Sequence, residues 1–286
     1  MYKTYINKLI LPTDHDENMF ISQLKRYCYG SVYPYKIFPM KDLLEIELAP
    51  VTIFYGGNGS GKSTLLNIIA EKTEVIRHSA FGQSPFFDNY VGSCCIKGKE
   101  IPEHSQILTS DDVSDYILNV RYLNDGIDIR REELIREYVE RKYKKHEIID
   151  IANYHDWKDD YDAKSKSESR FVKERLMRNA DMHSNGETAL KYFVEHISEN
   201  ALYLLDEPEN SLSIELQQEL CEYISASARH FGCQFIMASH SPVILSIKDA
   251  VIYDLDSTPV CRKKWTELEN VRRYFDFFEQ HHQEFI

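Results

Sequence analysis

Long apolar runs are missing from this sequence, and so is the paired cysteine spacing of a zinc site. No stretch approaches the roughly 18 to 20 uninterrupted apolar residues that a membrane-spanning helix requires, and Lys3, Asn7 and Lys8 interrupt the first residues. We therefore expect a soluble, cytoplasmic protein. Without C-x-x-C pairs, the six cysteines are interpreted as ordinary thiols of a reducing compartment. They are Cys28, Cys94, Cys95, Cys221, Cys233 and Cys261.

Positive charge is also scarce. The chain has 34 Lys and Arg against 46 Asp and Glu, a formal net charge of −12. This balance repels a phosphate backbone, so nucleic-acid binding is not indicated and would need a local basic patch or a partner chain. The charged segment 130–145 is interpreted as a solvated helix face held by pairs four residues apart, with a nucleic-acid or partner contact as the alternative. Internal repeats and long heptad runs are absent, so no coiled-coil arm is expected.

The most informative motif that is present is G-x-x-x-x-G-K-S at residues 56–63. It follows an apolar, β-branched run (51–55) and precedes an apolar helical segment (64–69), which is the strand, phosphate loop and helix order of nucleotide-binding proteins. Such a loop turns backbone N–H groups into one anion site at a helix start, where Lys62 would reach the β- and γ-phosphates and Ser63 would bind Mg²⁺. The expected ATP-binding residues are Gly57, Asn58, Gly59, Ser60, Gly61, Lys62, Ser63 and Thr64.

Further apolar runs predict a mostly parallel sheet. Residues 201–205, 234–238 and 251–253 are short and continuous, as buried parallel strands are, and an amphipathic helix is expected over 213–228 between the first two. Upstream, 43–49 and 51–55 are interpreted as a strand pair. The fold class is therefore α/β, with ligands at the carboxyl ends of the strands.

One domain over 1–286 with an inserted, mostly helical subdomain at about 111–183 is the expected organisation. Within the insertion, Leu134 and Tyr138 belong to an apolar stripe that continues through Ile135, Val139 and Tyr143, whereas 156–169 is polar and is interpreted as a mobile loop. At the end of the chain, an aromatic stripe at helical spacing is interpreted as core. Its residues are Leu268, Val271, Phe275 and Phe278.

Two acidic residues and a histidine follow predicted strands. Asp206 and Glu207 end the run 201–205, where Asp206 would bind Mg²⁺ or its water and Glu207 would polarise the water that attacks the γ-phosphorus. His240 follows the run that ends at 238 and would contact the γ-phosphate and the attacking water. We expect Glu207, His240 and Lys62 to be the catalytic residues.

A second anion site is expected at Ser184-Asn185-Gly186-Glu187, before the predicted helix 188–196. A serine three residues before a glutamate is a capping box, and the cap alone would explain the motif. The serine hydroxyl and free amides at a helix start also form an anion site. Ser184 and Gly186 are therefore candidate contacts to a second nucleotide.

These four elements, in this order, resemble the ATP-binding cassette superfamily. Within it, Asp206-Glu207-Pro208-Glu209 and Ala238-Ser239-His240-Ser241-Pro242 look like the soluble, non-transporter ATPases related to SMC-type and OLD-type heads, and the chain is most similar to short, stand-alone bacterial "AAA family ATPases" of cassette type. The resemblance implies a phosphate-loop ATPase fold with an N-terminal β element, ATP and Mg²⁺ as ligands, and a homodimer. In that dimer the signature serine, Ser184, would act on the nucleotide of the other subunit.

The sequence departs from the family pattern in three places. The signature has Ser-Asn-Gly-Glu instead of Ser-Gly-Gly-Gln, and Ser213 stands where transporter cassettes carry aspartate. The position of the metal-bridging glutamine is open, with Gln83 early and 110–112 at about the expected spacing. The adenine-stacking residue is also open. Its candidates are Tyr33, Tyr35 and Phe38, each of which could instead simply pack.

The expected function is ATP hydrolysis coupled to ATP-dependent dimerisation that regulates or drives a separately encoded protein partner, in a process such as DNA repair or phage defence. The alternatives are a transporter's nucleotide-binding subunit and a slow-turnover regulatory module. The acidic balance, the long insertion and Glu209 oppose the transporter interpretation.

Overall fold

The computed structural model describes residues 3–24, 31–143, 154–177 and 184–286. They form two compact units, Met1–Ser114 with Asn185–Ile286, and Asp115–Ser184. The expected helical insertion at about 111–183 therefore lies partly outside the described residues, as does Cys28. The five described cysteines, which follow Cys28 in the chain, are free thiols.

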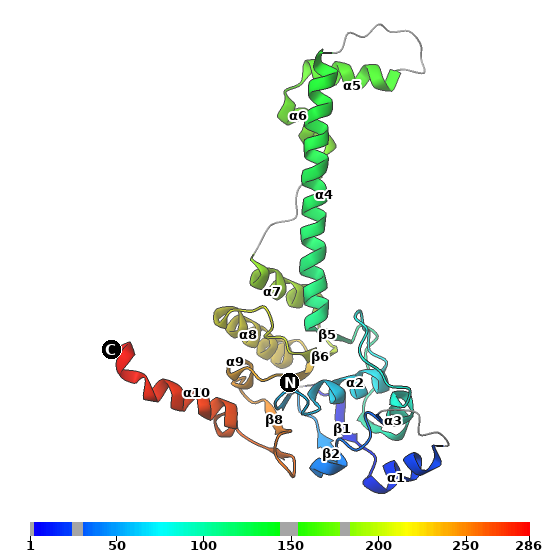
Figure 1. Cartoon of the computed structure of the whole chain (residues 1–286), viewed down its shortest axis with the longest axis vertical. Coiled ribbons are helices and arrows are strands. Elements are labelled where there is room, and N and C mark those ends of the chain that lie inside the picture. Colours follow the sequence, from blue (N-terminus) through cyan, green and yellow to red (C-terminus); the bar gives the residue numbers. More distant parts are fainter. Residues whose placement is uncertain (1–2, 25–30, 144–153, 178–183) are drawn as a thin grey trace. The chain divides into compact units, whose positions relative to one another are not determined.

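A six-stranded sheet forms the centre of the first unit, in the order β5-β6-β7-β3-β8-β9. Figure 1 labels β5, β6 and β8 of this sheet. All neighbouring strands are parallel except the last pair, and each predicted strand after the phosphate loop is confirmed. Apolar runs suit this position because the inner strands are covered on both faces. The strands are β3 (Val51–Tyr55), β5 (Gln106–Thr109), β6 (Leu202–Asp206), β7 (Gln234–Ala238), β8 (Val251–Asp254) and β9 (Cys261–Arg262).

A smaller antiparallel sheet holds the N-terminal strand β1 (Ile6–Ile10) between β2 (Glu45–Glu47) and β4 (Cys95–Gly98). The expected strand pair over 43–55 is thus wrong in its pairing, because β2 pairs with β1 whereas β3 pairs with β7 and β8. The buried amide of Gln234 joins the two sheets. It accepts from the N–H groups of Tyr5 and Ile6 and donates to the Ile6 and Ala49 carbonyls.

Helices of the first unit pack on these sheets around one core. The predicted helix after β6 is confirmed as α8, whose Leu220 and Ile224 are fully buried. Among the described residues, no helix combines the length and the hydropathy needed to cross a bilayer. The helices are α1 (Asp14–Gln23), α2 (Lys62–Thr73), α3 (Phe87–Ser93), α7 (Asn185–His196), α8 (Ile214–His230), α9 (Pro242–Leu245) and α10 (Glu269–Gln280), with 3-10 turns at Pro39–Lys41, Trp265–Glu267 and His282–Phe285.

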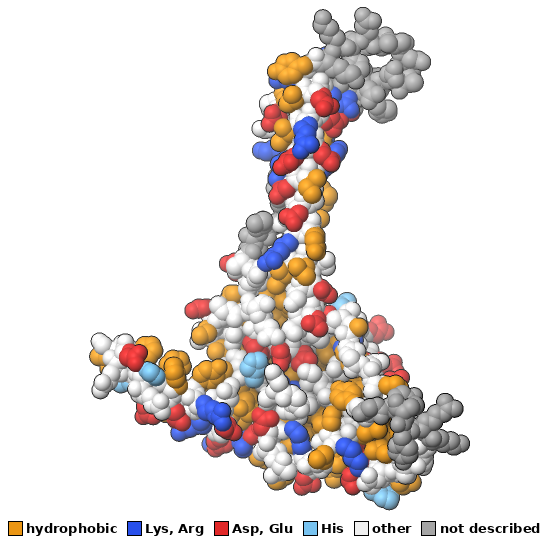
Figure 2. All heavy atoms as spheres, in the orientation of Figure 1, with side chains coloured by type: hydrophobic (Ala, Val, Ile, Leu, Met, Phe, Trp, Pro, Cys, Tyr) orange, Lys and Arg blue, Asp and Glu red, His pale blue; other side chains and the backbone are white. Residues whose placement is uncertain are grey.

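Helix α10 departs from the expectation of a core stripe. Leu268 and Val271 are buried, but Phe275 is 55% and Phe278 is 53% exposed. Figure 2 shows hydrophobic side chains along this C-terminal helix. The spacing predicted the helix correctly, and the assignment of its aromatic stripe to the core is wrong for the last two positions because only the first turn packs on the sheet unit.

The second unit is helical, with α4 (Ser110–Tyr143), α5 (Tyr154–Ser165) and α6 (Glu168–Arg175). The start of α4 belongs to the first unit. Its small core contains Leu134, Tyr138 and Phe171, whereas Val139 and Tyr143 of the predicted stripe are exposed.

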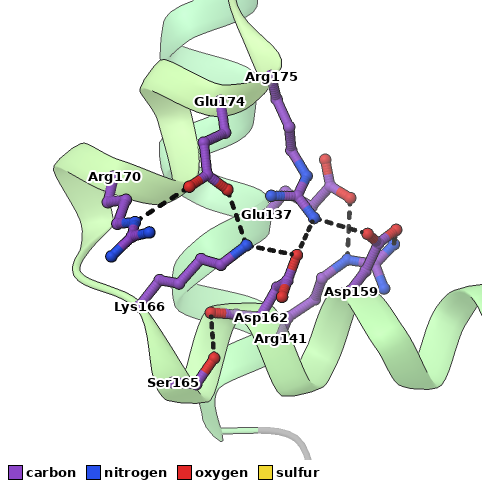
Figure 3. Close-up of polar contacts among 9 residues, drawn as sticks. All are labelled: Glu137, Arg141, Asp159, Asp162, Ser165, Lys166, Arg170, Glu174 and Arg175. Atoms are coloured by element: carbon purple, nitrogen blue, oxygen red, sulfur yellow. Dashed lines mark hydrogen bonds and ion pairs between the residues drawn. The ribbon is translucent and has the colours of Figure 1, made fainter.

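The predicted mobile loop at 156–169 is wrong, because most of it lies in α5 and α6. Ion pairs hold these polar helices (Figure 3). Arg175 contacts Asp162 at 3.0 Å, and Lys166 bridges Asp162 and Glu174 at 3.0 and 2.7 Å. Low aliphatic content was therefore compensated by charge pairing around the few buried aromatic and aliphatic side chains.

Candidate functional site

The phosphate loop lies between β3 and α2, as predicted. Gly59 and Gly61 have φ of 77° and 103°, a left-handed conformation that glycine adopts without strain. A Cβ at Gly61 would lie 3.2 Å from the ring of Phe38, so this ring supports the loop from the core side. Ser60 and Thr64 are buried, whereas Gly57, Asn58 and Gly59 are exposed at the surface where a ligand would arrive.

Lys62 is buried and folded back over the loop. Its Nζ donates to the carbonyls of Gly56 and Gly57 at 2.8 and 3.1 Å. A second ammonium that the sequence analysis missed, Lys41, donates to the carbonyls of Ser60 and Leu255 at 2.7 and 2.6 Å. Burial lowers the pKa of Lys41. The two lysine side chains thus hold three carbonyls of the loop, those of Gly56, Gly57 and Ser60.

Ser63 and Asp206 meet as the metal assignment requires. The Ser63 hydroxyl donates to Asp206 Oδ1 at 3.0 Å. Burial raises the pKa of Asp206 to about 6, and the Glu207 carboxylate also raises it. A hydroxyl beside a desolvated carboxylate is an oxygen donor set that suits Mg²⁺, and a cation there would offset the burial of the charge. The residues present therefore fit Mg²⁺.

Glu207 has an unusual backbone. Its φ is 49°, the left-handed region, which is uncommon for residues other than glycine and is found at functional sites. The conformation is fixed because its N–H donates to the Ala238 carbonyl at 2.9 Å and its carbonyl accepts from Asn210 at 3.1 Å. The side chain is held as well, since Asn210 Nδ2 donates to Glu207 Oε2 at 3.2 Å.

His240 lies two residues beyond β7, which the sheet places between β6 and β3. Asp206 is in register with Ala238, and Ala238 with Phe54, so the three strand ends are level. His240 Nδ1 lies 4.0 Å from Glu207 Oε1. A cavity of about 440 Å³ adjoins the ring and the loop residues Gly57 and Asn58.

Two acidic residues at this edge were not among the predicted site residues. Asp256 accepts from the Gly57 N–H at 2.8 Å and lines the same cavity. Glu209 is buried and contacts the turn that carries His240. Both residues follow a predicted strand within four positions, and Glu209 belongs to the Asp206-Glu207-Pro208-Glu209 motif, but burial is not visible from that spacing.

The predicted signature region lies at the start of α7. Ser184 directly precedes this helix and is exposed. Gly186 packs on the loop after β6, because a Cβ there would lie 2.7 Å from Leu216 Cδ1 and 3.1 Å from the Ser211 carbonyl oxygen. Glycine at 186 is therefore explained by close packing, and its contact with a second nucleotide stays a prediction.

The three aromatic candidates for adenine stacking have different positions. Phe38 and Tyr35 are buried in the core, and Tyr35 stacks on Phe20 with ring centroids 4.7 Å apart. Tyr33 is partly exposed and donates to Thr64 Oγ1 at 3.1 Å. Of the three, Tyr33 alone combines exposure with contact to the first turn after the phosphate loop.

The glutamine role stays open between two places. Gln83 is exposed in the segment before α3. Asp112 is buried and accepts from the backbone N–H and the hydroxyl of Thr109 at 2.7 and 2.8 Å. Since Thr109 is in register with Asp206, the 109–112 segment reaches the same strand edge.

Comparisons with known proteins bear on the family and on the fold. A family model described as "AAA domain, putative AbiEii toxin, Type IV TA system" matches residues 83–246, more than half of the chain, including Asp206, Glu207 and His240. No curated protein matches the sequence. With the observed sheet, the match confirms the expected α/β fold of a phosphate-loop ATPase.

Solved structures similar to the chain include heads of SMC proteins and a transporter ATPase. The SMC head domain from Thermotoga maritima is 13% identical with a TM-score of 0.41, covering 91% of this chain and 99% of that one. The Smc head from Pyrococcus furiosus, bound to the C-terminal domain of ScpA, is 14% identical with a TM-score of 0.38, covering 82% and 94%. The structure of cbiO1 from Clostridium perfringens, part of the transporter complex cbiONQ, is 15% identical with a TM-score of 0.35, covering 83% of this chain and 86% of that one.

Proposed function

The chain belongs to the family described as "AAA domain, putative AbiEii toxin, Type IV TA system", and on that premise we propose that it binds ATP with Mg²⁺ and hydrolyses the γ-phosphate anhydride. The whole chain, 1–286, would act as one cassette-type ATPase domain with a helical insertion at about 111–183.

One observation carries the proposal. The phosphate loop, the pair Asp206-Glu207 and His240 come from three neighbouring strand ends and meet at one edge of the sheet. Ser63 and Asp206 lie 3.0 Å apart, and Glu207 and His240 lie 4.0 Å apart. A cation-binding pair beside a base and a histidine is the arrangement that in-line phosphoryl transfer to water requires.

Each residue has a distinct role in this proposal. Lys62 exchanges its two carbonyl partners for phosphate oxygens, and the exposed amides of the loop bind the same anion. Ser63 and Asp206 hold the Mg²⁺, which neutralises charge on the phosphates when bound. Glu207 accepts the proton of the attacking water, and the His240 ring orients that water beside the terminal phosphate.

Dimerisation is the second part of the proposal. Ser184 and Gly186 of one copy would contact the nucleotide held by the other, so that ATP joins two copies and hydrolysis releases them. The exposed position of Ser184 and of Gly57–Gly59 supports a contact between chains at these surfaces. We further propose a cytoplasmic homodimer that acts on a separately encoded protein partner, in keeping with the toxin system named in the family's description.

The test compares Glu207→Gln with the parent protein. We expect hydrolysis to fall by about 100-fold or more while ATP affinity stays within a few-fold, because the carboxylate acts on the transition state. The matched control is Glu219→Gln, the same change on the exposed face of α8. Phosphate release and equilibrium binding of ATP are the measurements.

Light scattering with saturating ATP and Mg²⁺ tests the dimer. The Glu207→Gln variant should show twice the mass of one chain, and the mass should halve when Ser184→Arg is added. Parent-like hydrolysis by Glu207→Gln would refute the role of Glu207. A single-chain mass for Glu207→Gln with ATP would refute the dimer and leave the hydrolysis proposal intact.

A further inference from the structure

Glu209 is a buried carboxylate directed at the turn that carries His240. It follows Pro208 at the end of the turn after β6, and its side chain is 6% exposed. Its Oε1 accepts from Ser239 Oγ at 2.8 Å, from His240 N–H at 2.9 Å and from Ser241 N–H at 3.2 Å. Three donors on one oxygen fix the backbone on both sides of the histidine.

The three hydrogen bonds alone do not explain why residue 209 is a carboxylate. A neutral amide oxygen could accept the same three donors, whereas a carboxylate is costly to bury. Its second oxygen, Oε2, is buried and has no hydrogen-bond partner among the described residues. The group placed to respond to the charge is the imidazole of His240, whose Nδ1 lies 3.4 Å from Glu209 Oε1.

We propose that Glu209 is a positioning residue that fixes the proton of His240 on Nδ1. This inference rests on the proposed function of His240. Nδ1 is near two carboxylate oxygens, 3.4 Å from Glu209 and 4.0 Å from Glu207, so both favour a proton there. Nε2 is then the unprotonated ring nitrogen, which accepts a hydrogen bond from the attacking water, and Glu209 holds the ring in one orientation.

The turn itself has a second support that does not depend on this charge. Ser241 Oγ donates to Gln217 Oε1 at 2.6 Å and accepts from the Val243 N–H at 3.2 Å at the start of α9. Gln217 Nε2 donates in turn to the Leu212 carbonyl at 3.0 Å. Because this network anchors the turn from α8, Glu209→Gln should remove the charge and leave the fold in place.

The first experiment measures the imidazole directly. Nitrogen NMR of histidine-labelled protein, with His240→Gln to assign the signal, should show the proton on Nδ1 in the parent and on Nε2 in Glu209→Gln. Glu219→Gln should give the parent spectrum. An identical tautomer in the parent and in Glu209→Gln would overturn the proposal, whether or not the protein hydrolyses ATP.

The second experiment is a double-mutant cycle on ATP hydrolysis. Glu209→Gln should lower kcat by about tenfold with KM changed less than about twofold, and it should have no further effect in the His240→Ala background. An equal loss in both backgrounds would overturn the proposal, because Glu209 would then act elsewhere. If Glu209→Gln does not fold, Ser239→Ala, which removes one contact to Glu209, should show the same dependence on His240 with a smaller loss.

The two experiments separate the inference from the proposed function. A parent protein that shows the Nδ1 tautomer, dependent on Glu209, and yet hydrolyses no ATP would refute the function and retain the positioning role. A parent protein that hydrolyses ATP but lacks the Nδ1 tautomer would retain the proposed function and refute the positioning role of Glu209.

Discussion

The carboxyl ends of the parallel strands and helix α10 both depart from the usual burial of apolar and exposure of charged side chains, but in opposite ways. At the ends of the parallel strands, the Asp206 side chain is partly buried and that of Glu209 is almost completely buried. On α10, aromatic side chains that proteins normally bury are about half exposed. These exposed residues are Tyr274, Phe275, Phe277 and Phe278.

The difference between the regions lies in how the unusual groups are compensated. Each buried carboxylate has specific donors, such as Ser63 for Asp206 and Ser239 for Glu209. The α10 aromatics instead contact rings of their own C-terminal segment: Phe277 and Phe278 lie with centroids 5.5 Å apart, and Phe278 also contacts Phe285. Buried charges with fixed donors are common at sites that act on ligands, whereas exposed apolar faces are common at surfaces for association.

The largest expected effect is at the sheet edge. Lys62→Ala should abolish detectable ATP binding and lower hydrolysis by about 100-fold or more, because the proposed function assigns the phosphate contact to this buried ammonium. Calorimetric titration with ATP and Mg²⁺ measures it, with Lys97→Ala on β4 as the exposed control. If Lys62→Ala still bound ATP, the assignment of ATP binding to the phosphate loop would be wrong.

The same chemical change should separate buried from exposed aromatics. Phe235→Ala on β7 removes a fully buried ring and should lower the free energy of unfolding by about 3 to 5 kcal/mol. Phe275→Ala on α10 should change it by less than about 0.5 kcal/mol. Denaturant unfolding of both variants checks this, and equal losses would show that α10 is packed in solution.

Asp206 gives a pH-dependent prediction. Its folded pKa is raised to about 6 from the usual 3.8, so the folded state binds the proton more tightly and ionisation of this group destabilises it as pH rises from 3.8 to about 6. Without nucleotide, Asp206→Asn should therefore be more stable than the parent above pH 6, by on the order of 2 kcal/mol after loss of the Ser63 contact. The gain should vanish near pH 4. Unfolding at a series of pH values measures it, and a constant gain would contradict the cause.

The smallest expected effect concerns the start of α7, which is packed more closely than the exposed face of α10 but contains no buried charge described above. Gly186→Ala should lower the free energy of unfolding by about 1 kcal/mol, because the new methyl group would press on the flexible end of Leu216 and on the Ser211 carbonyl. Thermal unfolding measures this, and Gly92→Ala in α3, where a Cβ meets nothing within 4 Å, is the control. If Gly186→Ala changed the free energy of unfolding no more unfavourably than Gly92→Ala does, the start of α7 would be as loosely packed as α10.

Local chemistry made the phosphate loop, the strands and the helix α8 predictable. Lys62 and Asp206 each follow or end an apolar strand run, and parallel strands bring such ends to one edge. Glu209 and Lys41 could not be assigned in the same way, because their roles depend on contacts with residues 30 and more than 200 positions away. Pairing of β2 was missed for the same reason.

Periodicity and composition were less reliable where packing partners decide the outcome. The α10 spacing predicted a helix but said nothing of what would cover Phe275 and Phe278. The polar stretch in α5 and α6 looked disordered because ion pairs such as Arg175 with Asp159 form only in the folded unit. Sequence patterns identify elements, whereas burial depends on neighbours that the pattern does not contain.

The left-handed backbone of Glu207 restricts which side chains position 207 can hold without strain. Side chains branched at Cβ clash in that conformation, and for most residues it costs about 1 to 2 kcal/mol. Glycine, asparagine and aspartate adopt it more readily, but they shorten or remove the carboxylate. Few single substitutions of Glu207 therefore preserve both the backbone conformation of the turn and the length of the acidic side chain.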